Sequence, residues 1–329
     1  MNQVMKFAIR EQVSDELDNL NTPCGQQALF CRLYRERDLS INLVHQINHL
    51  VKDVQRHRGV SMGLLAGNKA FENDFYVMQN QISRRLSTLS AFAVSEGDVF
   101  GERERQNVQI AWDSIRHNWQ GDKLSDNFEL HSHFIEQLFQ IVNLIRRQLE
   151  PPLLANFAEE VSIHASFDEA NKASATEYSQ QTKQIELLQF TCLLLPTIVE
   201  TLAKIRGLAS FSAAVGSAQY DHDRKLRFLV QTAKEQNERL RQRAQRLHAV
   251  IGSEFNAKYI VGELETKFVH LIELVIHDVL SGKTIHASSS QLFNLATNLI
   301  DKYWSIVDDG LDLVRHWHRE ELERWITMK

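Results

Sequence analysis

Core-facing positions recur along most of the chain at the spacing of one helix face. Between residues 24 and 66 this stripe consists of Leu43, Ile47, Leu50, Val54, Ser61 and Leu65. Spacings of three, four and seven residues are typical of an amphipathic helix. Thr22-Pro23 is a favourable helix start, because threonine can cap and proline fits the first helical position. The pattern therefore predicts one long helix over 24–66 that ends at Gly67-Asn68.

The same periodicity predicts further long helices. They cover about 70–95, 101–119, a segment from a cap at Ser125 or Asp126 to about 149, 182–215 with a kink at Pro196, 221–251, 257–281 and 289–324. Residues 165–181 are polar and small, which indicates a linker. We therefore predict an all-α protein with an N-terminal segment (1–23), a first four-helix half (24–164), the linker (165–181) and a second four-helix half with a C-terminal helical tail (182–329).

The composition excludes several classes of protein. The 329 residues include only 13 glycines and 4 prolines, roughly 4% and 1% against usual values of about 7% and 5%. A chain so poor in turn-forming residues does not build a many-stranded sandwich or barrel. The formal net charge of −5 argues against binding of the whole chain to nucleic acid or to an anionic membrane. A local site for a small anion stays compatible with this charge.

Three features indicate the compartment. The cysteines Cys24, Cys31 and Cys192 have neither metal nor redox spacing, and their odd number fits a reducing environment. The N-terminus has no basic start followed by an apolar run, so we expect no signal peptide. The most apolar stretch, residues 187–199, is too short to span a bilayer. We expect a soluble, cytoplasmic protein.

The two predicted halves are related in sequence. The segment around Arg58-Gly59 aligns with the segment around Arg206-Gly207 at an offset of 148 residues. SDNFELHSHFIEQLFQIV also aligns with SQLFNLATNLIDKYWSIV at an offset of 165 residues, with the identical pairs Ser125/Ser290, Phe128/Phe293, Leu130/Leu295, Ile135/Ile300, Ile141/Ile306 and Val142/Val307. Helical periodicity alone does not also match a serine and two Arg-Gly steps in the same order. We interpret the chain as a tandem repeat of a four-helix unit, packed about a pseudo-twofold axis.

Both repeat-related arginines are predicted to face the interior. On a helical wheel Arg58 lies about 40° from Val54, and Arg206 lies about 40° from Leu202. An inward guanidinium needs an anionic or carbonyl partner, because a bare buried charge costs several kcal/mol. Two arginines related by a twofold axis can converge on one small anion. A planar oxyanion suits them, because the guanidinium fork donates two parallel hydrogen bonds to adjacent oxygens.

Two other interpretations of the arginines remain open. A single arginine near a helix stripe usually extends to solvent or pairs with a carboxylate of another helix. The chain would then be a helical scaffold or adaptor that binds no ligand, and Glu136 and Asp301 are candidate partners for the arginines. In the other interpretation the same architecture binds a different small anion.

The two arginine segments resemble a known family. QRHRGVSMGLLAG and KIRGLASFSAAVG resemble the two arginine-containing signatures of the nitrate- and nitrite-sensing (NIT) domain family, and the resemblance covers roughly residues 26–315. It implies an all-helical sensor whose two four-helix bundles bind nitrate or nitrite between them. One departure is His57, where the family commonly has an acidic residue before Arg-Gly.

The resemblance assigns roles to individual residues. Arg58 and Arg206 become the anion clamp, and Ser61 and Ser210 become candidate hydroxyl donors. Arg146 is a weaker third candidate, Arg147 is weaker still, and Arg56 is expected to point outward. Well-known members of the family carry an additional RNA-binding antitermination, kinase or receptor module. We expect a stand-alone sensor here, since only a helical tail follows residue 315, so that the output requires a separate effector protein such as an antitermination or transcription regulator.

Other chemistry is weakly represented in the sequence. It has no inward Glu-x-x-His pairs for a di-iron site, no haem attachment motif and no Gly-rich phosphate loop. We expect neither enzymatic activity nor a metal or other cofactor. A basic run contains Arg239, Arg241, Arg243 and Arg246, but interleaved glutamates indicate a solvated face. We therefore expect no nucleic-acid partner and no membrane partner, while a homodimer remains open.

Overall fold

The computed structural model describes residues 23–95, 100–157, 178–216 and 220–327, and its regular elements there are helices without any strand. This confirms the all-α prediction. The predicted N-terminal segment lies outside the described residues except for Pro23, and most of the predicted linker, up to residue 177, also lies outside them.

The first group of helices follows the apolar pattern closely. The long elements are α2 (Pro23–Leu65), α3 (Glu72–Ser95), α4 (Glu102–Arg116) and α5 (Leu124–Leu149), with short 3₁₀ turns at Lys69–Phe71, Trp119–Gly121 and Leu153–Phe157. Gly67 ends the first helix with φ at +85°, a conformation that glycine adopts without strain. The predicted cap of α5 was wrong: the helix starts at Leu124, and the Ser125 hydroxyl donates to the Asp126 carboxylate instead.

The second group contains two π-helical turns. Its elements are α7 (Gln180–Gln189), a π turn (Phe190–Leu194), α8 (Leu195–Val215), α9 (Tyr220–Ile251), a 3₁₀ turn (Gly252–Glu254), α10 (Ala257–Leu274), a π turn (Val275–Val279) and α11 (Ser289–Thr327). A kink is predicted at Pro196, and the structure has a π turn at Phe190–Leu194, just before this proline. Proline has no N–H and its ring crowds the carbonyl four residues earlier, and Cys192 at that position lies inside the π turn.

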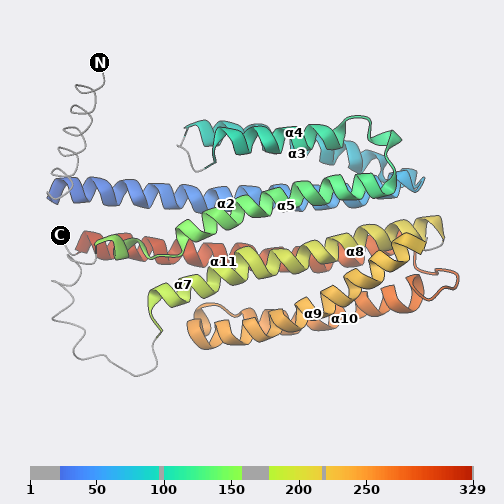
Figure 1. Cartoon of the computed structure of the whole chain (residues 1–329). Helices are drawn as coiled ribbons and strands as arrows, with labels where there is room; N and C mark the ends of the chain where they lie inside the picture. Colours follow the sequence, from blue (N-terminus) through green and yellow to red (C-terminus); the bar gives the residue numbers. More distant parts are fainter. Residues whose placement is uncertain (1–22, 96–99, 158–177, 217–219, 328–329) are drawn as a thin grey trace, which may run out of the picture.

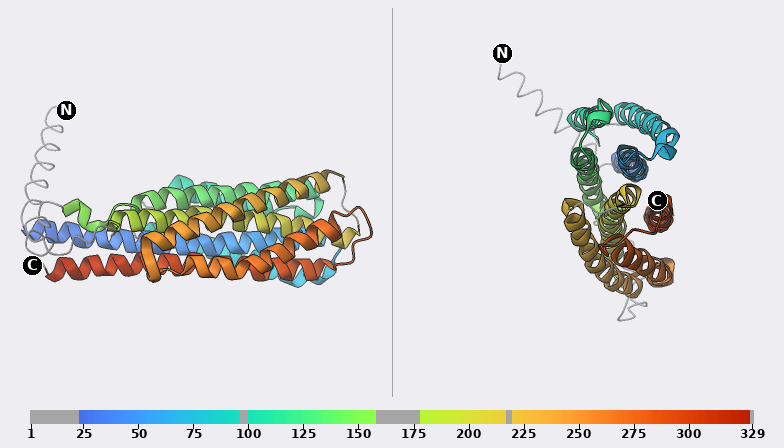
Figure 2. Two further views of the ribbon diagram at one scale, coloured as in Figure 1. Left: turned by 90° about the horizontal axis from the view of Figure 1, so that it is seen from below. Right: turned by 90° about the vertical axis from the view of Figure 1, so that its right-hand side faces the viewer.

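The helices run roughly along one long axis (Figures 1 and 2). The helix α2 contacts α3 and α5 on one side and α8 and α11 on the other, while α8 also contacts α9, and α10 packs on α9 and α11. One continuous hydrophobic cluster includes residues from both groups. The start of α2 and the end of α11 lie at the same end of the molecule (Figure 1).

A small aromatic cluster joins the start of α2 to the end of α11. Trp325 stacks on Phe30 with ring centroids 4.6 Å apart, and Phe157 packs against both rings. The buried Glu321 carboxylate accepts the backbone N–H groups of Leu153 and Leu154. The helical tail is therefore packed onto the body of the protein.

One helical stretch meets the length and composition of a membrane span. It runs over residues 180–215, and 67% of its apolar window is buried inside the protein. The apolar stretch over residues 187–199 is therefore part of a longer helix, most of whose apolar window is covered by other helices.

Candidate functional site

Arg58 on α2 and Arg206 on α8 both lie in the interior, with exposed fractions of 0% and 2%. This confirms the inward orientation predicted from the helical wheel. The glycine after each arginine faces the other group of helices. A Cβ added at Gly59 would lie 2.7 Å from the Phe293 ring, and one added at Gly207 would lie 2.8 Å from the Met62 sulfur. Glycine at these two positions allows the helices to approach closely.

Each arginine contacts a phenylalanine and a hydroxyl on one partner helix. The Arg58 guanidinium lies 5.4 Å from the Phe128 ring centroid and donates through Nη1 to Ser132 Oγ at 3.1 Å, both on α5. The Arg206 guanidinium lies 4.8 Å from the Phe293 ring centroid and donates through Nη1 to Thr297 Oγ1 at 2.9 Å, both on α11. The alignment at an offset of 165 residues pairs Phe128 with Phe293 and Ser132 with Thr297.

Across the interface, Arg58 forms a two-point ion pair with Glu200 of α8. Its Nη1 donates to Oε1 at 2.7 Å and its Nη2 donates to Oε2 at 3.1 Å. Gln55 Nε2 also donates to Oε2 at 2.9 Å, and Lys204 Nζ lies 3.6 Å from Oε1. The carboxylate is therefore held by groups from both α2 and α8.

Glu200 is a site residue that the sequence reasoning missed. Of the carboxylates proposed there as arginine partners, the exposed Glu136 lies 3.9 Å from His133. Asp301 lies 3.6 Å from Lys52, and its charge also acts on Arg206 and favours the charged guanidinium. A usable signal was present, because Glu200 precedes Arg206 by six residues within the most apolar helix of the chain. A carboxylate in such a helix needs a buried partner.

Arg206 has neutral partners only. Its Nη2 donates to the Gln55 carbonyl at 2.7 Å, and its second acceptor is the Thr297 hydroxyl. Among the described residues, no carboxylate forms an ion pair with it. Burial, together with the nearby positive charge of Arg58, lowers the pKa of Arg206 to about 9. Among the described residues, the negative charges of Asp301 and Glu200 act on this buried cation from beyond ion-pair distance.

Buried donors without a partner lie on the two helices that carry the arginines. Within the described residues, Nε of Arg58, Nε of Arg206 and the hydroxyls of Ser210 and Ser212 are buried without a hydrogen-bond partner. Buried polar groups of this kind are usually satisfied. Together with Lys204, the two arginines lie near the carboxylate of Glu200, and the charge of Asp301 also acts on Arg206.

The remaining predicted residues fall into three groups. Ser61 is buried, but its hydroxyl already lies within hydrogen-bond distance of two acceptors, Asn127 Oδ1 at 2.7 Å and the Arg58 carbonyl at 3.0 Å. Arg146 pairs with Glu150 and lies fourteen residues after Ser132, about 21 Å along α5, so the fold does not bring it to the other arginines. Arg56 and Arg147 are exposed, as predicted for Arg56.

A histidine pair lies next to Arg58. His131 Nδ1 is 2.7 Å from the Asn127 carbonyl, which requires a proton on that nitrogen, so its Nε2 accepts from His57 Nδ1 at 2.8 Å. Burial lowers the pKa of both rings, that of His131 to about 3, so both are neutral at pH 7. The residue before Arg58 is therefore a neutral, hydrogen-bonded ring.

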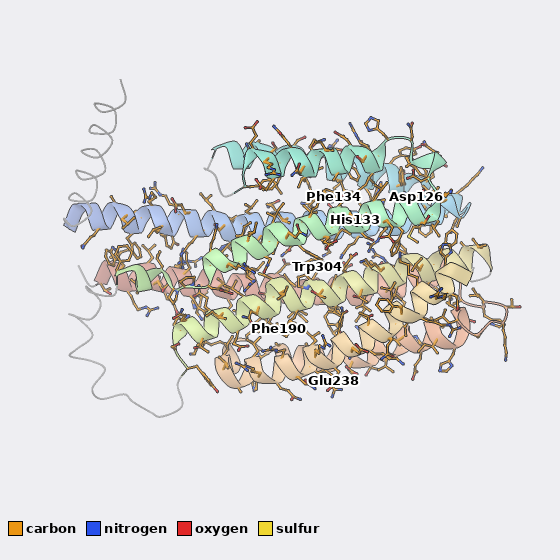
Figure 3. The ribbon with its side chains drawn as sticks, in the orientation of Figure 1. Asp126, His133, Phe134, Phe190, Glu238 and Trp304 are labelled. Atoms are coloured by element: carbon orange, nitrogen blue, oxygen red, sulfur yellow. The ribbon has the colours of Figure 1, made fainter. Side chains whose placement is uncertain are left out.

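The interior site is distinct from the open hollows on the surface. One hollow of about 510 Å³ lies between α2 and α3 and is lined by Gln46, Asn80, Arg84 and Thr88, among others. A second lies between α3 and α4. Neither includes Arg58 or Arg206. Trp304, whose indole N–H reaches Gln55 Oε1 at 3.4 Å, lies near the middle of the molecule (Figure 3).

Comparison with known proteins gives no match: no family model, curated protein or solved structure is similar to this chain.

Proposed function

We propose that the chain is a cytoplasmic sensor of a small oxyanion, nitrate or nitrite, held between Arg58 and Arg206. The observation that supports it most directly is Arg206, which is buried beside a second arginine and has only neutral acceptors. An unpaired buried charge costs several kcal/mol. A monovalent anion between the two guanidinium groups would offset that cost. The free donors of Arg58 Nε, Arg206 Nε and Ser210 Oγ are available to it.

We also propose that the fold is a tandem repeat of two four-helix units related by a pseudo-twofold axis. In this assignment α2 to α5 form the first unit and α7 to α11 form the second. The support is that each arginine contacts a phenylalanine and a hydroxyl that the sequence alignment pairs independently. The same arrangement supports assignment to the nitrate- and nitrite-sensing family, as a member without an RNA-binding module.

In this proposal the ligand acts by changing helix packing. Arg58 lies on α2 and Arg206 on α8, and α11 contacts both helices. An anion that binds one arrangement of these helices more tightly than the other shifts the population toward it. The change is passed to a separate effector protein, and no reaction, metal or other cofactor is involved.

A scaffold without a ligand is the second candidate. The observation in its favour is the two-point ion pair between Arg58 and Glu200, which already satisfies one of the two arginines. In that function the arginines only hold α2 against α8. The protein would then respond to small anions no more than an ordinary helical protein does.

Anion-dependent thermal unfolding tests the proposal. Wild type, Arg206→Met and the exposed control Arg147→Met are heated with nitrate, nitrite, chloride or sulfate at matched ionic strength. A ligand at about 100 times its Kd adds about 2.7 kcal/mol of stability. We expect nitrate or nitrite to stabilise wild type and Arg147→Met, and not Arg206→Met. Equal responses of all three proteins to all four anions would favour the scaffold.

A further inference from the structure

The carboxylate of Glu200 occupies the place on Arg58 that a planar oxyanion would take. Its two oxygens accept from the two Nη atoms at 2.7 and 3.1 Å, the two-point geometry that a guanidinium offers to nitrate, nitrite or a carboxylate. We infer that Glu200 is a built-in competitor of the ligand, and that the site accepts planar monovalent oxyanions because they displace this carboxylate. The inference rests on the proposed sensor function.

The surroundings of Glu200 provide a second position for its carboxylate. Lys204 lies one turn further along α8, and its Nζ is 3.6 Å from Glu200 Oε1. The Lys204 side chain is 28% exposed and that of Glu200 is 11% exposed, whereas the Arg58 side chain is fully buried. A change of side-chain rotamer toward Lys204 takes the carboxylate outward and keeps it next to a cation. Arg58 then presents its fork to the incoming anion.

Displacement of Glu200 affects other helices through the hydrogen bonds of Gln55. Gln55 donates to Glu200 through Nε2, accepts from Trp304 of α11 through Oε1, and offers its backbone carbonyl to Arg206. When Glu200 leaves, the Gln55 amide loses one of its two side-chain partners. The contact between α2 and α11 at Trp304 is therefore coupled to the occupant of Arg58.

The competitor also sets the affinity and the selectivity. A ligand that needs Arg58 free binds with an apparent Kd raised by the fraction of molecules in which Glu200 has moved away. A planar anion presents two oxygens in one plane to the fork, as the carboxylate does. Perchlorate has the same charge as nitrate but a tetrahedral shape, and chloride offers a single atom. Shape therefore separates nitrate, nitrite and formate from perchlorate and chloride.

The variant Glu200→Gln tests this inference by titration calorimetry of the full chain. Glutamine keeps the shape of the side chain and removes the charge that competes for Arg58. We expect nitrate and formate to bind at least about tenfold more tightly than to wild type if Arg58 is free in less than a tenth of the molecules. Perchlorate and chloride should gain no comparable affinity. Glu186→Gln is the matched control, because that side chain is 12% exposed and pairs with Arg246 instead.

The outcomes separate the inference from the proposed function. Nitrate binding to wild type with the same Kd in Glu200→Gln overturns the competitor and leaves the sensor. No nitrate binding to either protein overturns both. Binding to Glu200→Gln alone supports the competitor and overturns the sensing of nitrate by wild type.

A second variant covers the case in which Glu200→Gln does not fold. Lys204→Met removes the position to which the carboxylate moves, so we expect nitrate to bind several-fold more weakly than to wild type, while formate weakens in parallel. An unchanged Kd for both anions would contradict the displacement of Glu200 toward Lys204.

Discussion

Arg58 and Arg206 have equivalent neighbours on their own sides of the interface, but the interior behind them differs. Behind Arg58 two polar pairs are buried, His57 with His131 and Ser61 with Asn127. The aligned positions near Arg206 are apolar and equally buried: Ile205, Ala296, Ala209 and Leu292. Where one member of a polar pair near Arg58 has an apolar residue at its aligned position near Arg206, the other member does too. This is expected if the contacts of one half have counterparts in the other half.

The difference also extends across the interface. Arg58 meets the carboxylate of Glu200, whereas Arg206 meets the carbonyl of Gln55. The position aligned with Glu200 in the first half is Lys52. Arg58 thus has a carboxylate as its partner and buried polar pairs behind it, while Arg206 has neutral acceptors and apolar residues behind it. The two arginines are therefore expected to contribute differently to the stability of the fold.

The largest expected effect is that of Arg58→Met on stability. Among the described residues, the substitution leaves the Glu200 carboxylate with Gln55 as its hydrogen-bond partner and with Lys204 at 3.6 Å. Breaking a buried ion pair by removal of one partner costs about 3–5 kcal/mol. We therefore expect the free energy of unfolding, measured with urea, to fall by about that amount.

The double variant Arg58→Met/Glu200→Gln is the control for this prediction. It removes both charges, and the glutamine keeps a hydrogen-bonding side chain at position 200. We expect it to recover most of the stability lost in the single variant. A double variant that is as unstable as Arg58→Met would mean that packing of the long side chain, and not the ion pair, is what matters.

The second prediction concerns the effect of low pH on stability through the buried pair His57 and His131. Both rings have a lowered pKa in the folded protein, while in the unfolded chain they bind protons near pH 6.5. The unfolded state therefore gains protons first as the pH falls, and stability decreases from about pH 6.5 toward pH 3. Between pH 7 and pH 5.5 we expect a loss of about 2–3 kcal/mol for the two histidines together.

The second half of the chain supplies the matched variant for this test. His57→Ile/His131→Ala installs the residues found at the aligned positions, Ile205 and Ala296. We expect urea unfolding of this variant to show a much smaller change in stability over the same pH range. His133→Ala, which removes an exposed histidine, should keep the wild-type dependence. An unchanged pH slope in the double variant would assign the acid sensitivity to other groups.

Much of the fold could be predicted because helix periodicity is local. The long helix ending near residue 66, the inward phase of Arg58 and Arg206, and the outward phase of Arg56 follow from spacing alone. The start of α5 could not be predicted in the same way. Ser125 is a good capping residue in isolation, but its hydroxyl binds Asp126 in the folded chain.

The missed parts of the site depend on contacts between distant segments. Glu200 is 142 residues from its partner Arg58, and His131 is 74 residues from His57. No local pattern specifies which of several carboxylates crosses the interface: Glu136 lies on the exposed side beside His133, and Asp301 acts on Arg206 without forming an ion pair with it. The alignment of the halves contained more information: it pairs Ser132 with Thr297, and both hydroxyls accept from an arginine.

The smallest expected effect on stability is that of Arg206→Met, and it completes the comparison. Removal of this guanidinium leaves no carboxylate without a partner, because its acceptors are the Thr297 hydroxyl and the Gln55 carbonyl. It also removes the repulsion from Arg58 that helps to lower the pKa of Arg206. Replacement of a poorly compensated buried charge by an apolar side chain is often neutral. We expect urea unfolding to change by less than about 1 kcal/mol, while the response to nitrate is lost. A loss as large as that of Arg58→Met would show that both arginines serve the fold equally.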